Sequence, residues 1–484
     1  MLYIGVDLGT SGVKVILVNE KGEILNTVSK EYPLLIPKPM FSEQNPKDWL
    51  DKTVEAICEL TKDVKIVNGV SFSGQMHGLV VLDEDDKVIR PAILWNDQRT
   101  EKQCDFLNNE IGKEFLLKHT GNIALTGFTA PKLLWLKENE PENFNRISKI
   151  MLPKDYIAYS LSGVFASDVS DSSGTLYFDC KNKCWSKEML EILNVDLSQL
   201  PKVYESYEAV GKMKDKYVKE FALENSPKIV IGGGDQAMGA IGTGTVKNGE
   251  ASLALGTSGV MFVSLEDFNI DKEYGIHSFA HANGKYHMMS VMLNATGSIS
   301  WFFENILKRK DFDVITSEAK KISNDNNLFF LPYLTGERTP INDPNAKGAF
   351  IGLGLEHSEV NMFLAVLEGV AFAFRDSYEV FKKLGINIHK LRITGGGSAN
   401  DLWVQIISNV LNTEIEYINT SEGGALGACI LSSVACGQFD TIPEACDFFI
   451  KATKNVYPNK EEVEIYNNKY NKFKKIYPTI KSLF

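Results

Sequence analysis

The sequence predicts a two-lobed α/β protein in which one kind of domain occurs twice. The string GTSGV stands at Gly9–Val13 and again at Gly256–Val260, 247 residues later and about half a chain away. Each copy lies between two apolar, β-rich runs, and strand-like runs alternate with helical ones between the copies. This alternation is typical of α/β domains. A chain of 484 residues is long enough to hold two such domains.

Both glycine turns are predicted to be β-hairpins. The strands Leu2–Val6 and Ala251–Leu255 lead into them, and Val13–Val18 and Val260–Val263 lead out. A Walker A loop would instead open a helix and carry GKS or GKT, which this chain lacks. The pattern therefore argues against a P-loop NTPase.

The remaining elements are predicted from the spacing of apolar residues and from the glycines that mark turns between them. We expect a boundary near residues 244–250, where GTGTVKNGE is polar and glycine-rich, which gives lobes of 1–245 and 246–484. The expected elements are a helix at Asp48–Lys62, strands at Ile66–Phe72 and Lys228–Ile231, a long helix or two at Glu359–Leu384, a strand at Lys390–Thr394, a helix from about Asn400 to Leu411, a small-residue helix at Gly423–Cys436, and a helix ending the tail Lys454–Phe484.

Composition excludes several classes of partner. The net charge of −11 disfavours nucleic acid and anionic membranes. No apolar run approaches the length of a membrane span, and the N-terminus does not resemble a secretory signal. Seven scattered cysteines without framework spacing fit reduced thiols, so we expect a cytoplasmic protein. The oligomeric state stays open, and a homodimer is the expectation by frequency alone.

Two aspartates stand at turns that follow strands. Asp7 ends the first strand beside a glycine turn, where a carboxylate suits a divalent cation bridged to phosphate. Its alternative role is an ordinary turn aspartate that bonds its own backbone. Asp235 follows GGG, and could accept the proton of a hydroxyl that attacks phosphorus, or simply cap a helix. The second turn has Ala254 where Asp7 would align, so the two turns are chemically unequal.

Two further polar turns follow predicted strands. Ser73–Gly78 (SGQMHG) places hydrogen-bonding groups at a strand end, where ligand sites of α/β folds gather. Gly395–Ser398 (GGGS) joins a strand to a helix and suits close passage of a nucleotide, although it could be only a tight connection. Asn400 either caps the helix that follows or reaches the ligand.

Long stretches of the chain, in family order from Asp7 to about Cys436, resemble the FGGY carbohydrate kinases. The stretches SGQMHGLVVLD and RPAILWNDQR resemble the branch that acts on D-xylulose in particular. The others are GFTAPKLLWLKEN, LPKDYIAYSLSG, SDVSDSSGT, LPYLTGERTP and GAFIGLGLEHSEVNMFLAVLE. The resemblance implies two lobes of the actin/hexokinase/Hsp70 type, each built on a five-stranded RNase H-like sheet, with a ligand cleft between them.

The resemblance also implies an activity, namely transfer of phosphate from ATP to the terminal hydroxyl of D-xylulose, with Mg²⁺. It makes Asp235 the general base and Asp7 the residue that positions Mg²⁺ and phosphate. The sugar contacts it implies are Met76, His77, Gln236 and Trp95. The nucleotide contacts it implies are Gly9, Thr10, Gly256, Thr257, Ser258, Trp301, Gly396, Gly397 and Asn400.

One departure from the family pattern concerns the sugar. Gln236 follows Asp235 where the D-xylulose branch usually has Asn, and glycerol kinases carry Gln there. The alternatives are therefore a related kinase for ribulose, glycerol or gluconate, or a non-enzymatic sugar sensor or assembly protein of the actin-like fold. The retained pair of Asp7 and Asp235 argues against the last.

Overall fold

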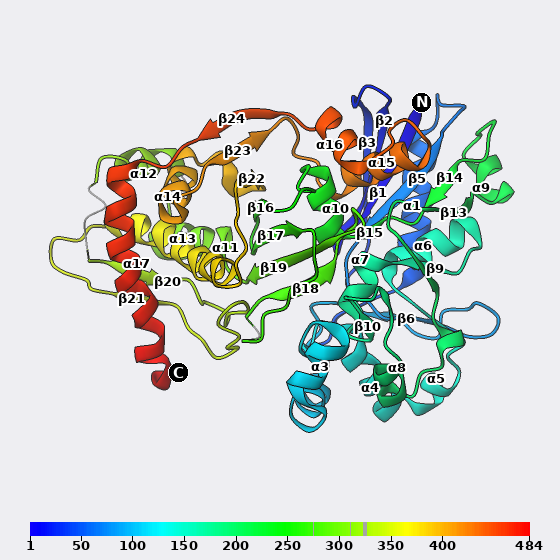
Figure 1. The fold of residues 1–484 in the computed structure, drawn as a ribbon, viewed down its shortest axis with the longest axis horizontal. Helices are drawn as coiled ribbons and strands as arrows, with labels where there is room; N and C mark the ends of the chain where they lie inside the picture. Colours follow the sequence, from blue (N-terminus) through cyan, green and yellow to red (C-terminus); the bar gives the residue numbers. More distant parts are fainter. Residues whose placement is uncertain (274, 310, 323–326) are drawn as a thin grey trace.

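The computed structural model describes residues 1–273, 275–309, 311–322 and 327–484. The chain forms two lobes, each around one mixed seven-stranded sheet (Figure 1). The first sheet contains β13 (Ala209–Lys212), β14 (Lys228–Val230), β5 (Gly69–Gly74), β1 (Leu2–Leu8), β2 (Gly12–Asn19) and β3 (Ile24–Glu31) in this order, with β15 (Gly233–Gly234) also on β5. The second contains β18 (His277–Ala280), β19 (Tyr286–Met292), β17 (Gly259–Leu265), β16 (Glu250–Leu255), β22 (Lys390–Thr394), β23 (Ile415–Ile418) and β24 (Ala452–Val456).

The two sheets share one pairing pattern, which confirms the predicted duplication. In the first, β3, β2 and β1 pair antiparallel, and β5 and β14 then continue parallel to β1. In the second, β19, β17 and β16 pair antiparallel, and β22 and β23 continue parallel to β16. Both glycine turns connect antiparallel neighbours, as the hairpin prediction requires. The five expected strands are present in each lobe. The edge strand β13 and the short β15 enlarge the first sheet to seven strands, and the edge strands β18 and β24 enlarge the second.

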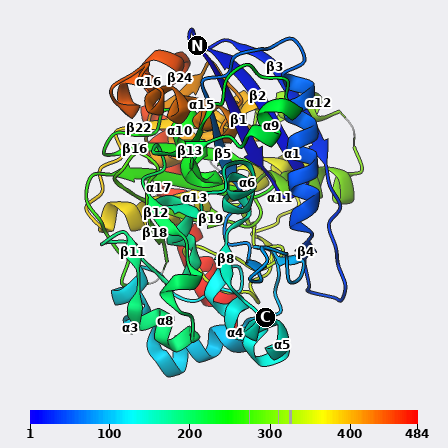
Figure 2. The same ribbon diagram turned by 90° about the vertical axis from the view of Figure 1, so that its right-hand side faces the viewer.

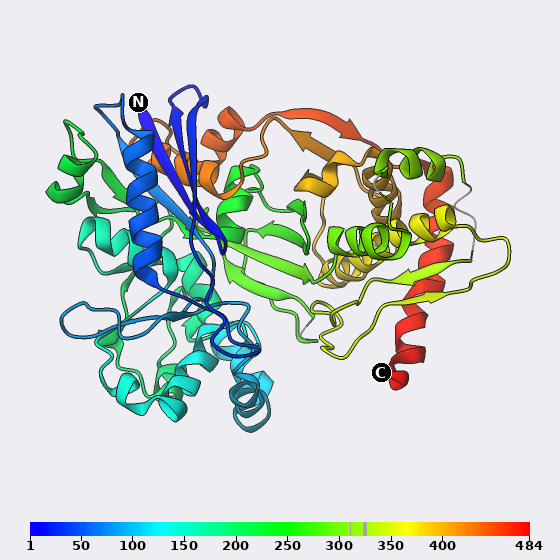
Figure 3. The ribbon, with the colours of Figure 1, turned by 180° about the vertical axis from the view of Figure 1, so that it is seen from behind.

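Helices cover the sheets (Figures 2 and 3). The helices up to residue 245 are α1 (Pro46–Leu60), α2 (Glu101–Asp105), α3 (Lys113–Thr120), α4 (Thr129–Asn139), α5 (Pro141–Asn145), α6 (Pro153–Ser162), α7 (Val169–Ser172), α8 (Lys187–Leu193), α9 (Asp215–Glu220) and α10 (Asp235–Gly242). Those beyond are α11 (Thr296–Trp301), α12 (Phe312–Ala319), α13 (Glu359–Lys383), α14 (Asp401–Leu411), α15 (Gly424–Ala435), α16 (Ile442–Phe449) and α17 (Lys460–Ile480). The paired short strands are β4 (Glu43–Gln44) with β7 (Ala92–Ile93), β6 (Val80–Leu82) with β8 (Lys149–Met151), β9 (Ala166–Asp168) with β12 (Lys202–Tyr204), β10 (Phe178–Asp179) with β11 (Cys184–Trp185), and β20 (Phe329–Leu331) with β21 (Ala349–Ile351). Helices α3, α4, α5 and α8 lie together with short strands below the first sheet (Figures 2 and 3).

The central strands of the first sheet are buried on both faces. On one face, Ile4 and Val6 of β1 pack in the same cluster as Trp49 of α1. On the other face, Tyr3 packs with residues of α15, including Leu426. In Figures 1 and 3, α15 and α16 accordingly lie beside the first sheet, although their residues come late in the chain. The boundary between residues 245 and 246 stays a prediction.

Helices α10 and α15 pack together at the junction of the lobes, with their backbones unusually close. A Cβ atom built on Gly427 of α15 would lie 2.1 Å from the carbonyl oxygen of Met238 in α10. One built on Gly242 of α10 would lie 2.0 Å from the carbonyl oxygen of Gly423. Only glycine allows this approach. The small residues of Gly423–Cys436 therefore allow α15 to lie against α10 and the first sheet.

Replacing Gly427 with alanine should destabilise the protein. The new methyl group would clash with a backbone oxygen, and overpacking of this kind costs about 1–3 kcal/mol. The midpoint of thermal unfolding should therefore fall. Gly239→Ala in α10 is the matched control, because its Cβ meets nothing within 4 Å and alanine favours a helix. Equal midpoints for the two variants would contradict the close contact.

Candidate active site

The first hairpin turn is held by hydrogen bonds from several elements. The amide of Gly9 donates to the carbonyl of Gly12 at 3.0 Å, and the Tyr32 hydroxyl donates to the carbonyl of Gly9. The side-chain amide of Gln44 donates to the carbonyl of Thr10 at 2.7 Å. The indole of Trp95 donates to the Thr10 hydroxyl at 2.9 Å. The turn is therefore fixed from outside its own hairpin.

Gln44 is a supporting residue that the sequence did not reveal. Its side-chain oxygen accepts from the buried indole of Trp49 at 3.0 Å and from the side-chain amide of Gln75 at 3.1 Å. The Thr10 hydroxyl in turn donates to the Gln75 oxygen at 3.2 Å. Gln44 thus connects the first turn to the SGQMHG segment. No motif surrounds it, so only the fold could identify it.

Asp7 and Asp235 lie near each other because strand pairing brings them together. Asp7 of β1 is paired with Ser73 of β5, whose hydroxyl donates to its carboxylate at 2.7 Å. The two-residue strand β15 pairs with Ser73 and Gly74 on the side of β5 that is opposite to β1. Asp235 is the residue that directly follows β15. Both carboxylates therefore lie at the same end of these strands, near the C-terminal ends of β1 and β15.

Burial and the neighbouring Asp7 affect the protonation of Asp235. Burial raises the pKa of Asp235 to about 7, with a further contribution from the negative charge of Asp7. A hydrogen bond from the Gln236 side chain lowers this pKa. Burial also raises the pKa of Asp7, while the hydrogen bond from Ser73 and the positive charge of Lys14 lower it. A carboxyl group with a pKa near 7 is suited to proton transfer at neutral pH.

Asp235 starts α10 rather than capping it, because the cap position belongs to Gly234. Its side chain lines a 290 Å³ cavity together with Gln236. The opposite wall comes from the second lobe and includes Val260, Thr394 and Gly395. The carboxyl group is thus placed between the lobes.

Met76 and His77 follow β5 in a tightly packed turn. His77 has a positive φ of 69°, and its Nδ1 lies 2.7 Å from the carbonyl oxygen of Gly174. Lys132 donates to the backbone oxygen of His77 at 2.8 Å. Burial, with a smaller effect of the Lys132 charge, lowers the pKa of His77 well below its usual value. The imidazole is therefore neutral, with Nδ1–H donating to Gly174 and Nε2 left as an acceptor.

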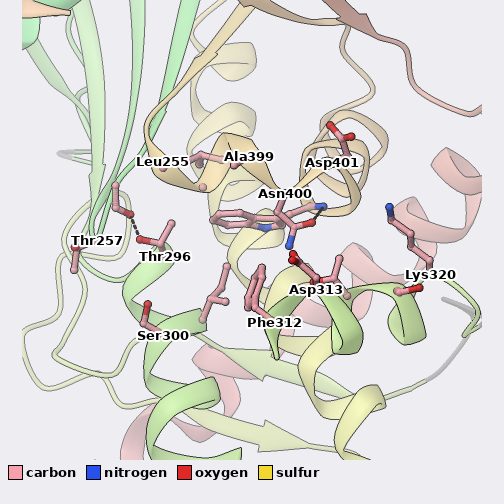
Figure 4. A pocket seen from close by; sticks show the side chains of 17 residues that line it. Leu255, Thr257, Thr296, Ser300, Phe312, Asp313, Lys320, Ala399, Asn400 and Asp401 are labelled. Atoms are coloured by element: carbon pink, nitrogen blue, oxygen red, sulfur yellow. Dashed lines mark hydrogen bonds between the residues drawn. The ribbon is translucent and has the colours of Figure 1, made fainter. Parts of the chain in front are cut away.

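A second and larger cavity, of 760 Å³, lies in the second lobe at the other hairpin turn (Figure 4). Of the predicted nucleotide contacts, it is lined by Gly256, Thr257, Gly396, Gly397 and Asn400. Figure 4 shows these segments opposite Phe312 and Asp313 of α12. This wall was missed, because α12 carries no recognisable motif.

Asn400 takes one of the two roles that the sequence left open, and its contact with a ligand stays a prediction. Its side-chain oxygen accepts from the amide of Trp403 at 3.2 Å and so caps α14. Its Nδ2 has no hydrogen-bond partner within the described ranges, and Asn400 lines the cavity. The residue can therefore cap the helix and still donate to a ligand.

Four predicted nucleotide contacts do not line the large cavity, and two of them, Gly9 and Thr10, lie on the first hairpin turn. Trp301 was expected along it, but Ile299 and Ser300 take this place. The Trp301 ring instead stacks on Phe330, with ring centroids 6.1 Å apart. Since α11 turns about 100° per residue, neighbouring side chains point in different directions. Ser258 lies exposed on the hairpin turn, outside this cavity.

In the described part of the chain, no helix is long and apolar enough to cross a membrane.

Comparison with known proteins agrees with this arrangement. The chain is 37% identical to the xylulose kinase of Bacillus subtilis (strain 168), with 99% of this chain and 97% of that protein covered. Two solved structures from Lactobacillus acidophilus are both 29% identical and cover 99% of this chain and 98% of theirs. They are a ligand-bound xylulose kinase, with a TM-score of 0.95, and a gluconate kinase, with a TM-score of 0.94.

The family assignment covers both lobes. Residues 2–242 match the N-terminal domain of the FGGY carbohydrate kinases, and residues 251–436 match the C-terminal domain. The two matched regions contain the acid pair at the edge of the first sheet and the large cavity of the second lobe. The chain belongs to the FGGY family of carbohydrate kinases.

Proposed function

We propose that this kinase transfers the γ-phosphate of ATP to the terminal 5-hydroxyl of D-xylulose. The single observation that carries the reaction type is Asp235, a carboxyl group with a pKa near 7 placed between the lobes. The choice of sugar is supported by the full-length identity to the Bacillus subtilis xylulose kinase and by the SGQMHG segment. Fold likeness alone does not choose the sugar, because the gluconate kinase is equally similar in structure.

In the proposed mechanism, Asp235 accepts the proton of the sugar hydroxyl as this hydroxyl attacks phosphorus. Met76, the neutral imidazole of His77, Gln236 and Trp95 hold the sugar. The second hairpin turn, with Gly256, Thr257 and Ser258, holds the phosphates, and the adenosine end lies along Gly396, Gly397 and Asn400. Phosphoryl transfer depends mainly on this positioning and on exclusion of water.

Mg²⁺ fits the residues beside Asp235. Asp7 adds a second, partly buried carboxylate close to it, and oxygen ligands are those that Mg²⁺ prefers. In our proposal, Asp7 holds the ion, with Gly9 and Thr10 beside the phosphate. When bound, the ion supplies positive charge that neutralises the phosphate oxygens.

The substrate is tested by ADP release with MgATP and D-xylulose, D-ribulose, L-ribulose, glycerol or gluconate, against a blank without sugar. D-Xylulose should give the highest kcat/KM. A preference for another substrate would contradict the sugar assignment, and Gln236→Asn would then test whether this residue is responsible. Absence of any sugar-stimulated ADP release would favour a sensor or assembly role instead.

Asp235→Asn should lower kcat at least ~10²-fold, because removal of a general base commonly has this effect. Nucleotide binding should persist, and thermal stability should not fall, because the variant removes a buried charge. Asp215→Asn, at the first position of the exposed helix α9, is the matched control. Turnover close to the wild-type value in Asp235→Asn would rule out the general base.

The pH profile should report the ionisation of Asp235. Only the carboxylate can accept a proton, so kcat/KM for the sugar should rise with pH and level off above about 7. Below that point it should fall by about tenfold per pH unit. The measurement is made at low MgATP, so that the free enzyme is titrated. A profile that stays flat down to pH 5.5 would contradict the raised pKa.

A further inference from the structure

Behind the turn that carries Asp235 lies a buried chain of polar groups that the proposed reaction does not use. It begins at Lys154 of α6, whose side chain has no exposed surface. The Lys154 ammonium lies 2.8 Å from Asp168 Oδ1 and 2.5 Å from Asp155 Oδ1. A third carboxylate, Asp171, lies 3.8 Å away. The lysine is therefore fixed among three acids.

The chain continues from Asp168 to the backbone in front of Asp235. Asp168 Oδ2 accepts from the hydroxyl of Ser170 at 2.5 Å and from that of Ser206 at 2.6 Å. The Ser170 hydroxyl oxygen in turn accepts from the backbone amide of Gly234 at 3.2 Å. Gly234 immediately precedes Asp235. Three successive contacts thus run from Lys154 to the Gly233–Gly234 peptide, which lies just before the proposed base.

The backbone at this point is confined from two sides. A Cβ on Gly233 would lie 2.4 Å from Ser170 Oγ and 3.3 Å from Asp168 Oδ2. A Cβ on Gly234 would lie 2.8 Å from Cγ of Met76 on the opposite side. The two glycines are therefore held between the polar chain and a residue of the proposed sugar site.

A buried ion pair adds little net stability, because desolvation offsets most of the attraction between its charges. Its hydrogen bonds are directional, however, and they fix geometry where they are made. Both oxygens of Asp171 lack a hydrogen-bond partner among the described residues, so the order runs through Asp168 and Ser170. Without the Ser170 hydroxyl, the Gly234 amide would lose this contact, and the backbone in front of Asp235 could turn.

We propose that Lys154, Asp168 and Ser170 position the general base. Ser170 is the residue that connects this chain to the backbone in front of Asp235. This inference rests on the proposed function of Asp235. Ser170 touches no reacting atom, so it is a positioning residue rather than a catalytic one. Misplacement of a catalytic group by about 1 Å can lower a rate about 10²-fold.

Ser170→Ala tests the proposal, with Ser172→Ala as the matched control. Both serines lie fully buried on α7, but the Ser172 hydroxyl contacts the hydroxyl of Ser167, at 3.0 Å, and not Asp168 or the Gly234 amide. Ser170→Ala should lower kcat about 10- to 100-fold and leave KM for ATP within about twofold of wild type. Ser172→Ala should keep kcat with a similar loss of thermal stability. Equal kcat values for the two variants would overturn the proposal.

A second variant decides the question if Ser170→Ala does not fold. Gly233→Ala keeps every polar group but places a methyl group against Ser170 Oγ, and kcat should fall at least about tenfold. Unchanged kcat would overturn the proposal.

Asp235→Asn, assayed in parallel with the best sugar, separates the two hypotheses. If it is active, the base assignment fails; if it is inactive while Ser170→Ala is normal, only the positioning chain fails.

Discussion

The contact between α10 and α15 is the constraint on which the rest of the molecule depends. Helix α10 follows the last strand of the first sheet and faces the second lobe, while α15 follows β23 of the second sheet and packs on the first sheet. Their backbones meet without side chains between them, as the glycines at 242 and 427 require. Because Asp235 is the first residue of α10, this contact also determines where the proposed base stands relative to both lobes.

The duplicated sheets carry unequal chemistry. Both lobes repeat the same pairing of three antiparallel and two parallel strands, each with a glycine hairpin at the same place. The first hairpin has Asp7 at the end of its leading strand, whereas the second has Ala254 there. One fold therefore supplies acid in one lobe and a cavity of 760 Å³ in the other. The five-stranded pairing is reused, while the added strands, the helices and the side chains at the turns distinguish the two halves.

Local patterns predicted much of this structure. The strand Lys390–Thr394 agrees with β22 at both ends, and the helices at Asp48–Lys62 and Glu359–Leu384 agree with α1 and α13 within two residues. The features that were missed depend on tertiary packing. Gln44 acts through partners far from it in sequence, and α12 becomes a cavity wall only because of its place in the fold. Trp301 was misplaced because a motif gives a residue's position along a helix but not the direction of its side chain.

The return of α15 to the first sheet has a consequence for how the chain is made. The hydroxyl of Tyr3 in β1 donates to the side chain of Gln438 at 2.7 Å, across 435 residues of sequence. Such distant contacts form slowly, because a long loop must close first. During synthesis, β1 leaves the ribosome long before α15, which packs against one of its faces. Strand β1 thus stays incompletely enclosed until α15 has been made, and until then the nascent chain exposes an apolar face that a chaperone can hold.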